Sequence, residues 1–182
     1  MAEFLEIVKE RRSIRNYSDQ EVPEELLKQV FEAVRWAPSW ANTQCCRLVV
    51  VKDPGTKQKL QQTLAKGNPA TRAMVEAPVV IAVCGKLKCS GYYKEQASTK
   101  HGDWFMFDLG LATQNLCLAA HSMGLGTVVV GLFDHDQANQ ILQVPEGYEV
   151  VAMIPLGFPS RGTGAPKRME IPEFVYMERF TG

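Results

Sequence analysis

The sequence of 182 residues lacks an excess of charge of either sign, because its 20 basic side chains are matched by 20 acidic ones. A protein that binds nucleic acid or a membrane surface through its overall electric field needs charge of one sign, so we expect neither partner. Uncharged apolar runs of about 18 residues or more are also missing, which argues against a membrane span. The first residues carry acids instead of a cleavable apolar stretch, so we expect no signal peptide and a cytoplasmic protein.

Motifs for metal binding and for side-chain catalysis are missing as well. The five cysteines are odd in number and contain no C-x-x-C pair, and the three histidines have no metal-ligand spacing. We therefore expect reduced, mostly buried thiols and no metal site. Neither a P-loop nor a serine nucleophile elbow is present. This inventory favours a protein that binds an anionic cofactor and leaves the chemistry to it, with no catalytic side chain of its own.

Helical and strand patterns alternate along a chain whose 46% hydrophobic content can fill a sizeable core, so we expect a single domain over residues 1–182. The patterns predict helices over residues 3–10, 23–36, 53–66, a short stretch up to residue 76, 103–123 and from residue 134. Apolar runs predict buried strands over residues 46–53, 78–85, 126–131 and 148–158, and the tail from residue 159 ends in an amphipathic segment. This alternation indicates an α/β or α+β sandwich.

The helix predicted over residues 103–123 is apolar on nearly all sides, which is typical of a helix that is buried all round. In a chain of this length, burial of about six turns suggests that a second subunit covers part of it. We interpret Asp103 as a helix cap and Asp108 as a polar group at that interface. The preceding residues 86–102 are polar, aromatic and aperiodic, and form a candidate lid.

The stretch "KERRSIRNYSDQEVP" places three arginines beside a serine between two helical patterns. Arg11, Arg12, Ser13 and Arg15 can offer charge-assisted hydrogen bonds to a phosphate. The alternative is an exposed basic helix end that only complements the helix dipole. A second cationic pair, Lys167 and Arg168, lies in the tail; it can converge on the same anion or remain solvated.

Two further segments are candidates for ligand contact. "APSWANTQC" carries Pro38, Ser39, Asn42 and Gln44 between a helix and a buried strand, where amides and hydroxyls can read a heterocycle or simply form a turn. "GLGTVVVG" contains a Gly-x-Gly fragment, but its glycines follow a helix and open a strand, the reverse of a dinucleotide-binding fingerprint. We interpret these glycines as allowing close packing and a backbone approach at Gly131.

Taken in order, these motifs resemble those of the FMN-dependent nitroreductase family, particularly its short members. "RRSIRNY" is similar to the family's Arg-x-Ser-x-Arg/Lys loop, and "APSWANTQCCRLVVV" is similar to its entry into the first strand. "GTVVVGLFDHDQANQILQVPEGYEVVAMIPLGFP" resembles its later core, and Arg168 ahead of "EFVYME" matches its closing basic position. The resemblance spans about residues 5–178. It implies an α+β sandwich with a central, mostly antiparallel sheet flanked by helices, in an intertwined homodimer with FMN at the interface.

The resemblance also implies roles for individual residues. Arg11 and Ser13 would hold the FMN phosphate, Arg12 would contact phosphate or ribityl, and Arg168, with Lys167, would complete the phosphate site. Arg15 would face the pyrimidine edge of the flavin, where its charge favours the anionic reduced form.

The flavin ring has further implied contacts. The segment between the second predicted helix and the first strand, which we call the hinge, would contribute contacts from the other subunit through Pro38, Ser39, Trp40, Asn42 and Gln44. Asn68 would correspond to the family's mid-chain asparagine. The backbone of Val130, Gly131 and Leu132 would approach flavin N5. Two features depart from the family pattern: Cys45-Cys46 replaces the usual Pro-Trp, and the large Trp40 stands where a small residue is common.

The function implied is an FMN-dependent oxidoreductase. NADH or NADPH would pass hydride to flavin N5, and a small acceptor such as a nitroaromatic or a quinone would then take the electrons in a ping-pong cycle. Reductive dehalogenation and flavin fragmentation on the same fold remain alternatives, as does a non-catalytic or regulatory flavin-binding protein. A phosphate-ligand-binding module without redox function is a further alternative.

Overall fold

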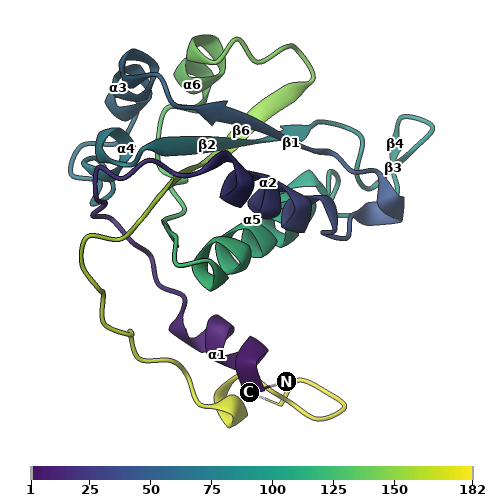
Figure 1. Cartoon of the computed structure of the whole chain (residues 1–182). Coiled ribbons are helices and arrows are strands. Elements are labelled where there is room, and N and C mark those ends of the chain that lie inside the picture. Colours follow the sequence, from purple (N-terminus) through teal and green to yellow (C-terminus); the bar gives the residue numbers. More distant parts are fainter. Residues whose placement is uncertain (1, 182) are drawn as a thin grey trace.

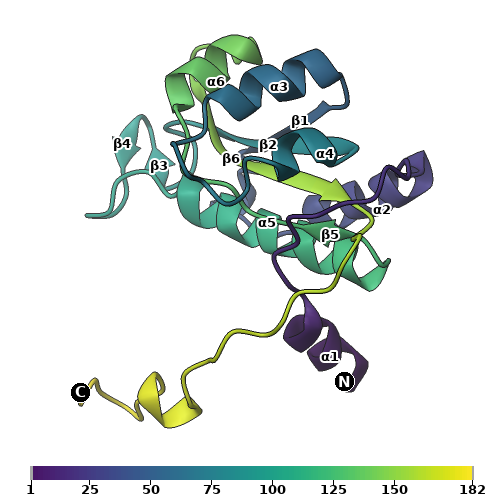
Figure 2. The same ribbon diagram turned by 90° about the vertical axis from the view of Figure 1, so that its left-hand side faces the viewer.

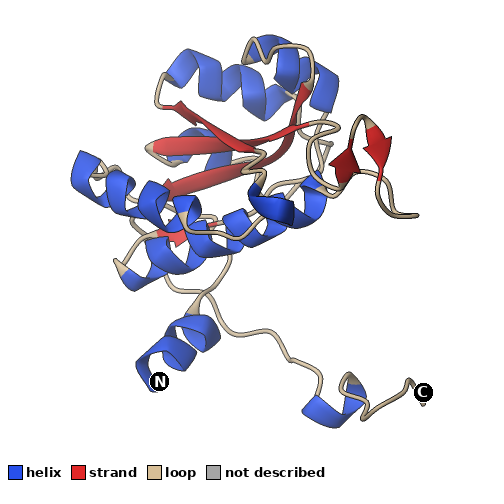
Figure 3. Cartoon of the chain, turned by 90° about the vertical axis from the view of Figure 1, so that its right-hand side faces the viewer, coloured by secondary structure: helices blue, strands red, loops and turns tan. Residues whose placement is uncertain are grey.

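The protein is built around a four-stranded antiparallel sheet between two layers of helices. This computed structural model describes residues 2–181 (Figure 1). The strands are β1 (Cys46–Val51), β2 (Val79–Lys86), β6 (Tyr148–Gly157) and β5 (Gly126–Thr127), in that spatial order. Helices α3 (Pro54–Gln62) and α6 (His135–Ile141) cover one face, and α2 (Glu24–Arg35) and α5 (Phe105–Ser122) cover the other (Figures 1 and 3). The predicted sandwich with a mostly antiparallel sheet is confirmed.

The central strand β2 shows why two helical layers are needed. Its first seven residues are buried, and they alternate between two apolar cores. Val80, Ala82 and Cys84 pack into the core under α3, α6 and the short α4 (Ala73–Glu76). Val79, Ile81 and Val83 pack into the core shared with α2 and α5. Because successive side chains of a strand point to opposite faces, an unbroken apolar run predicts a sheet covered on both sides.

The helix starts follow the sequence signals. Pro23 stands before α2, and acidic residues fill its first turn. Asp53 accepts a hydrogen bond from the Thr56 amide at 2.7 Å and caps α3, and Asp134 caps α6 by accepting from the Gln137 amide at 3.0 Å. These capping side chains explain why both helices begin directly after their aspartates.

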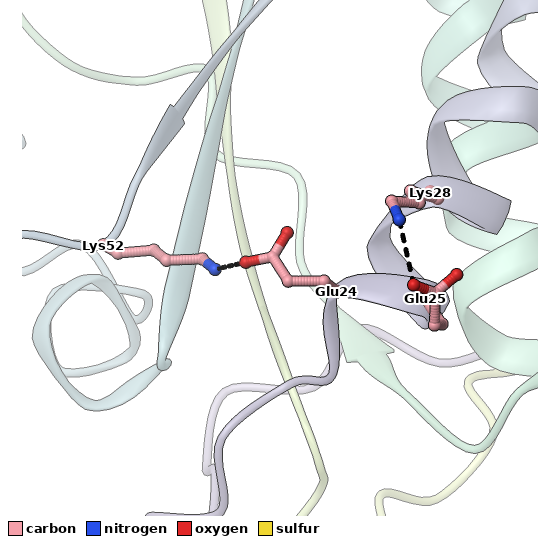
Figure 4. Close-up of polar contacts among 4 residues, drawn as sticks. All are labelled: Glu24, Glu25, Lys28 and Lys52. Carbon is pink, nitrogen blue, oxygen red and sulfur yellow. Dashed lines mark hydrogen bonds and ion pairs between the residues drawn. The ribbon is translucent and has the colours of Figure 1, made fainter.

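Two ion pairs lie at the start of α2, and one of them links the helix to the end of strand β1 (Figure 4). Glu24 pairs with Lys52, which follows β1, and the nearby Lys52 ammonium lowers the pKa of this carboxyl. Glu25 pairs with Lys28 of the next turn at 2.9 Å. Both pairs are exposed to solvent, so they orient the helix end more than they stabilise the fold.

The third predicted strand is shorter than expected. Residues 126–131 were the expectation, but β5 contains only Gly126 and Thr127, followed by a single bridge between Val130 and Met153. The pairing of Thr127 with Leu156 and of Val130 with Met153 places Pro155 opposite Val128. Proline has no N–H to donate, so the ladder is interrupted at this point.

Helix α5 is long and apolar as expected, but within one chain it is not buried on all sides. Met106 and Phe107 are 56% and 59% exposed, and Gly110 and Gln114 continue the same open face one and two turns later. The lid region before it contains a small hairpin of β3 (Tyr92–Tyr93) and β4 (Gln96–Ala97). None of the helices in residues 2–181 is long and apolar enough to cross a membrane.

Both ends of the chain extend away from the sandwich. Helix α1 (Ala2–Glu10) and the tail project from the body in each view (Figures 1 and 2). The amphipathic end of the tail contains only a 3-10 turn, η2 (Ile171–Glu173). Its apolar side chains lie open, for example Phe174, Met177 and Phe180 at 57%, 82% and 77% exposure. Such unpartnered apolar surface is typical of segments that pack against another chain.

Candidate functional site: an arginine-lined pocket

The arginine loop is held in place by β5. Helix α1 ends where the Arg11 amide donates to the Ile7 carbonyl at 3.0 Å, and the loop then runs beside β5. The Ile14 amide donates to the Thr127 carbonyl at 2.9 Å, and Ser13 bridges the same threonine. A Cβ on Gly126 would lie 2.7 Å from Ile14 Cβ, so this close approach requires glycine.

The tail runs back along the same loop. The Ser18 amide donates to the Phe158 carbonyl at 2.9 Å, and the Ser160 amide donates to the Asn16 carbonyl at 3.1 Å. The Arg161 guanidinium donates to the Asn16 side chain at 2.9 Å. These contacts lead residues 163–168 past the arginines, although the two segments lie at opposite ends of the sequence.

The loop and the tail enclose a pocket of about 500 Å³, which we call the anion pocket. It is lined by Arg11, Arg12, Ser13, Arg15, Thr163, Gly164, Ala165, Pro166 and Arg168. Its four guanidiniums form no ion pair with any carboxylate of residues 2–181. The four salt bridges found among these described residues use Lys28, Arg35, Lys52 and Arg72 instead. Unneutralised arginines gathered around one hollow are suited to a phosphate, which accepts several N–H groups at once.

The individual arginines have different freedom to bind. Arg12 already donates to the Lys9 carbonyl and to the Arg11 carbonyl, the latter at 2.9 Å, so part of its fork caps the end of α1. Arg15 is half-buried, its Nη1 is 3.4 Å from the Ser13 carbonyl oxygen, and its Nε is buried without a hydrogen-bond partner. A buried donor without a partner is costly, which indicates that a ligand acceptor belongs there.

A second pocket, of about 330 Å³, adjoins the first at Arg15, and we call it the Asn68 pocket. It is lined by Arg15, residues 66–70 and residues 128–132. The Asn68 side chain donates to the Leu132 carbonyl at 3.2 Å and accepts from the Ala70 amide at 2.9 Å. Its amide therefore keeps one N–H and one lone pair for a ligand.

The backbone at residues 130–132 forms the opposite wall of the Asn68 pocket. Val130 is 3% exposed, and its N–H and C=O are both bonded to Met153 at 2.9 Å. Gly131 is exposed, and a Cβ there would meet nothing within 4 Å, so a ligand can reach the main chain at this point. The three predicted residues thus line one pocket; Val130 is buried, whereas Gly131 and Leu132 are exposed.

The hinge residues lie apart from both pockets. Pro38, Ser39 and Gln44 line a different hollow, of about 170 Å³, beside Asp108 and Ala112 of α5. The backbone N–H of Gln44 donates to Ser39 Oγ at 2.9 Å, and Asn42 is exposed. Trp40 packs against Trp104 with ring centroids 5.1 Å apart. Within one chain the hinge does not meet the arginines, as expected if it serves a site on a second subunit.

Several site features were not foreseen from sequence. The pocket walls at Thr163 to Pro166 and, apart from the expected Asn68, at Lys66 to Ala70 carry no chemical motif. Lys167, unlike Arg168, does not line the anion pocket. Asp108 was expected to be an interface polar group, but it is already buried within the chain. The sequence contained an indication that Asp108 is buried, because this residue is the sole acid in the apolar stretch of α5.

The antiparallel α/β/α sandwich thus carries an arginine-lined pocket beside an amide-bearing one, and Arg15 lines both. Comparison with known proteins makes the assignment specific. The family model described as "Nitroreductase family" matches residues 8–76 and 70–158. The chain belongs to the nitroreductase family, as its motifs predict.

Curated relatives cover most of this chain. A protein of Methanothermobacter thermautotrophicus, provisionally named NADH dehydrogenase/NAD(P)H nitroreductase, is 30% identical over 98% of this chain and 88% of its own length. The FMN reductase (NAD(P)H) of Bacillus subtilis is 28% identical over 93% of this chain and 71% of its own. Iodotyrosine deiodinase 1 of Rattus norvegicus is 29% identical over 90% of this chain and 65% of its own.

Solved structures confirm the fold. The FMN-dependent nitroreductase of Clostridium difficile R20291 superposes with a TM-score of 0.80 over 97% of this chain and 99% of its own, at 24% identity. At this level of identity the likeness establishes the fold alone.

Proposed function

We propose that the protein is an FMN-dependent oxidoreductase that takes electrons from NADH or NADPH and passes them to a small acceptor such as a nitroaromatic or a quinone. The anion pocket carries this proposal, because its four arginines have no carboxylate partner in residues 2–181 and one of them, Arg15, also lines the Asn68 pocket. The relatives named as FMN reductase and as NAD(P)H nitroreductase support the same enzyme class.

The residues present fit FMN at both of its ends. Arg11, Ser13 and Arg168 offer charge and a hydroxyl to the phosphate, whereas Arg12 can give only the part of its fork that is not bonded to α1. The partnerless Nε of Arg15 suits a carbonyl oxygen on the pyrimidine edge of the ring. The spare groups of Asn68 suit the alternating donors and acceptors of the same edge.

When bound, FMN supplies the redox chemistry through N5, so the chain needs no acid or base of its own. The protein's part is to bind and orient the ring. The main chain at Gly131 would leave room for the edge of the ring, and Arg15, which lines the same pocket, would place positive charge near the ring and favour its reduced form. Burial, together with the neighbouring Asp108 carboxylate, raises the pKa of the Cys45 thiol to about 12, so this thiol stays protonated near neutral pH and is a poor nucleophile.

We propose that the working unit is a homodimer with the cofactor at the interface, in the cytoplasm, where its unpaired thiols persist. The open face of α5, the projecting α1 and the apolar tail offer surface for a second chain. The hinge of the partner subunit would then complete the ring site that the hinge of the same chain does not reach.

Reductive dehalogenation is a second candidate, favoured by the similarity to an iodotyrosine deiodinase over 90% of this chain. It uses the same cofactor and the same binding residues, so cofactor content cannot separate it from the first. A halogenated phenol as the acceptor distinguishes the two.

The purified protein tests the proposal directly. We expect a yellow protein with a flavin spectrum that releases FMN on denaturation and rebinds it. We also expect NADH or NADPH to bleach that spectrum, and a panel of nitroaromatics, quinones and halogenated phenols to restore it. Protein that neither retains nor rebinds FMN contradicts the proposal. Bound FMN with negligible turnover identifies a non-catalytic flavin-binding protein instead.

A further inference from the structure

Asp108 is a carboxylate buried in the first turns of the otherwise acid-free helix α5, with 3% of its surface exposed. It has no ion-pair partner among residues 2–181. Burial of an unpaired carboxylate is unfavourable unless hydrogen bonds replace its water. The identity of its donors therefore indicates why the residue is there.

All the donors to Asp108 come from two loops outside its own helix. The Trp40 amide lies 3.1 Å from each carboxylate oxygen, and Cys45 Sγ lies 3.5 Å from Oδ2. Ser90, which is fully buried, donates its hydroxyl to Oδ2 at 2.5 Å. One carboxylate thus joins Trp40 and Cys45 of the hinge, residues 38–45, to Ser90 of the candidate lid, residues 86–102.

The hinge needs such a support because its backbone is strained. Ala41, Asn42 and Gln44 have left-handed φ angles of 44°, 55° and 49°. Residues with a side chain adopt this conformation at a cost, so it persists where surrounding contacts fix it. Ser39 and Trp40 accept hydrogen bonds from backbone amides of the residues that follow them, which closes the turn from inside. Asp108 fixes the turn from outside by accepting from the Trp40 amide.

The lid is coupled to the hinge through the same residue. The Trp104 amide donates to the Ser90 carbonyl at 3.0 Å, so Ser90 ties the start of α5 to Asp108. The Trp40 and Trp104 rings then meet with centroids 5.1 Å apart. A shift of the carboxylate would move the hinge and this aromatic pair together.

We propose that Asp108 is a positioning residue that sets the conformation of the hinge and couples it to the lid. The consequence for the cofactor rests on the proposed function, in which the hinge contacts the FMN held by the partner subunit. The conformational part stands on the hydrogen bonds alone.

The test compares Asp108→Asn with the wild-type protein by amide hydrogen exchange in peptides that cover residues 38–45. The amide side chain keeps the size of the carboxylate but puts an N–H against groups that also donate. We expect amide exchange in the hinge to become about tenfold faster, which corresponds to a decrease of about 1.4 kcal/mol in the free energy of local opening. Exchange in β2 should be unchanged. Unchanged exchange in the hinge overturns the proposal.

Asp103→Asn is the matched control. Asp103 accepts from the amides of Lys88 and Phe105, so it supports the lid and the helix start without touching the hinge. We expect hinge exchange in this variant to equal that of the wild type. Equal acceleration in both variants would show that any loosening of α5 acts on the hinge, and would overturn a specific role for Asp108.

Ser90→Ala keeps the proposal testable if Asp108→Asn does not fold. It removes one donor and leaves the carboxylate in place, so we expect a smaller acceleration in the same peptides, about threefold. No change there, together with an unchanged aromatic circular dichroism signal from Trp40 and Trp104, would contradict the coupling between lid and hinge.

FMN titration provides the second arm. If the proposed function holds, the dissociation constant of FMN rises about tenfold in Asp108→Asn and stays at the wild-type value in Asp103→Asn. A hinge that loosens without any change in FMN affinity overturns its role toward the cofactor. Wild-type protein that does not bind FMN refutes the proposed function, while the exchange data still decide whether Asp108 positions the hinge.

Discussion

At the scale of single residues, the arginines of one loop differ in which pocket they line. Arg11 lines only the anion pocket, whereas Arg15 lines both pockets and has a buried Nε without a partner. This arrangement agrees with the sequence-based assignment of Arg11 to the phosphate and Arg15 to the ring, which stays a prediction until FMN binding is measured.

We expect Arg11→Ala to raise the dissociation constant of FMN about 10- to 100-fold, because a charge-assisted hydrogen bond to the phosphate is lost. We expect Arg15→Ala mainly to make the flavin reduction potential more negative, by roughly 30 mV or more, because the reduced ring loses nearby positive charge. Fluorescence titration and spectroelectrochemistry measure the two effects. Arg72→Ala, whose arginine pairs with Glu76 outside both pockets, is the control. An equal rise of the FMN dissociation constant in both pocket variants, with no change in the flavin reduction potential, would refute the assignment of Arg11 to the phosphate and Arg15 to the ring.

Two thiols of the sheet, the half-buried Cys46 and the buried Cys84, make a separate prediction about pH. Burial raises the pKa of Cys46 and Cys84 to about 11, from an ordinary value of 9.0. Above pH 9.0 the unfolded chain releases these protons while the folded chain keeps them, so the free energy of unfolding falls as pH rises toward about 11. Urea denaturation across this range measures the slope. Cys84→Val removes one titrating thiol from the unfolded state, and its curve should fall less steeply; an identical slope would contradict the assignment.

At the scale of elements, the contact between the arginine loop and β5 depends on one glycine. We expect Gly126→Ala to destabilise the fold by about 1–3 kcal/mol, because the new methyl group overlaps Ile14, and to weaken FMN binding as Ser13 shifts. Denaturant unfolding and FMN titration measure the two effects. Gly162→Ala is the control, since a Cβ there meets nothing within 4 Å. Wild-type stability in the Gly126 variant would show that the loop is not docked as described.

The elements themselves were largely predictable because their signals are local. Asp53 and Asp134 mark the starts of α3 and α6 through bonds to amides only three residues away. The end of β5 was not predictable, because the interruption depends on Pro155 in the neighbouring strand, far along the sequence. Local chemistry fixes where helices start, whereas a strand's length depends on its partner.

At the scale of the whole molecule, the uncovered surface points to a second chain. Met106 and Phe107 leave the apolar face of α5 open, and α1 and the tail project from the sandwich (Figure 2). We expect sedimentation at twice the mass of one chain.

We expect Met106→Lys to weaken the dimer about tenfold or more and to lower FMN retention with it, because a charged side chain would enter an apolar interface. Sedimentation velocity over a range of concentrations, with flavin absorbance, follows both. Val75→Lys introduces the same charge at an exposed apolar position on α4, away from the proposed interface, and should sediment like the wild type. Dissociation without loss of FMN would show that each chain binds the cofactor alone.

The sequence by itself determined the element types, the arginine loop and the family, because helix caps, apolar periodicity and motif order are properties of neighbouring residues. Only the tertiary structure decided that Arg168 faces Arg11, that Asn68 bonds to Leu132, and that Asp108 is buried. Each of these depends on segments far apart in the chain that are brought together when the two cores close on the sheet. A side chain's partners across such a distance follow from packing, and packing has no local signature.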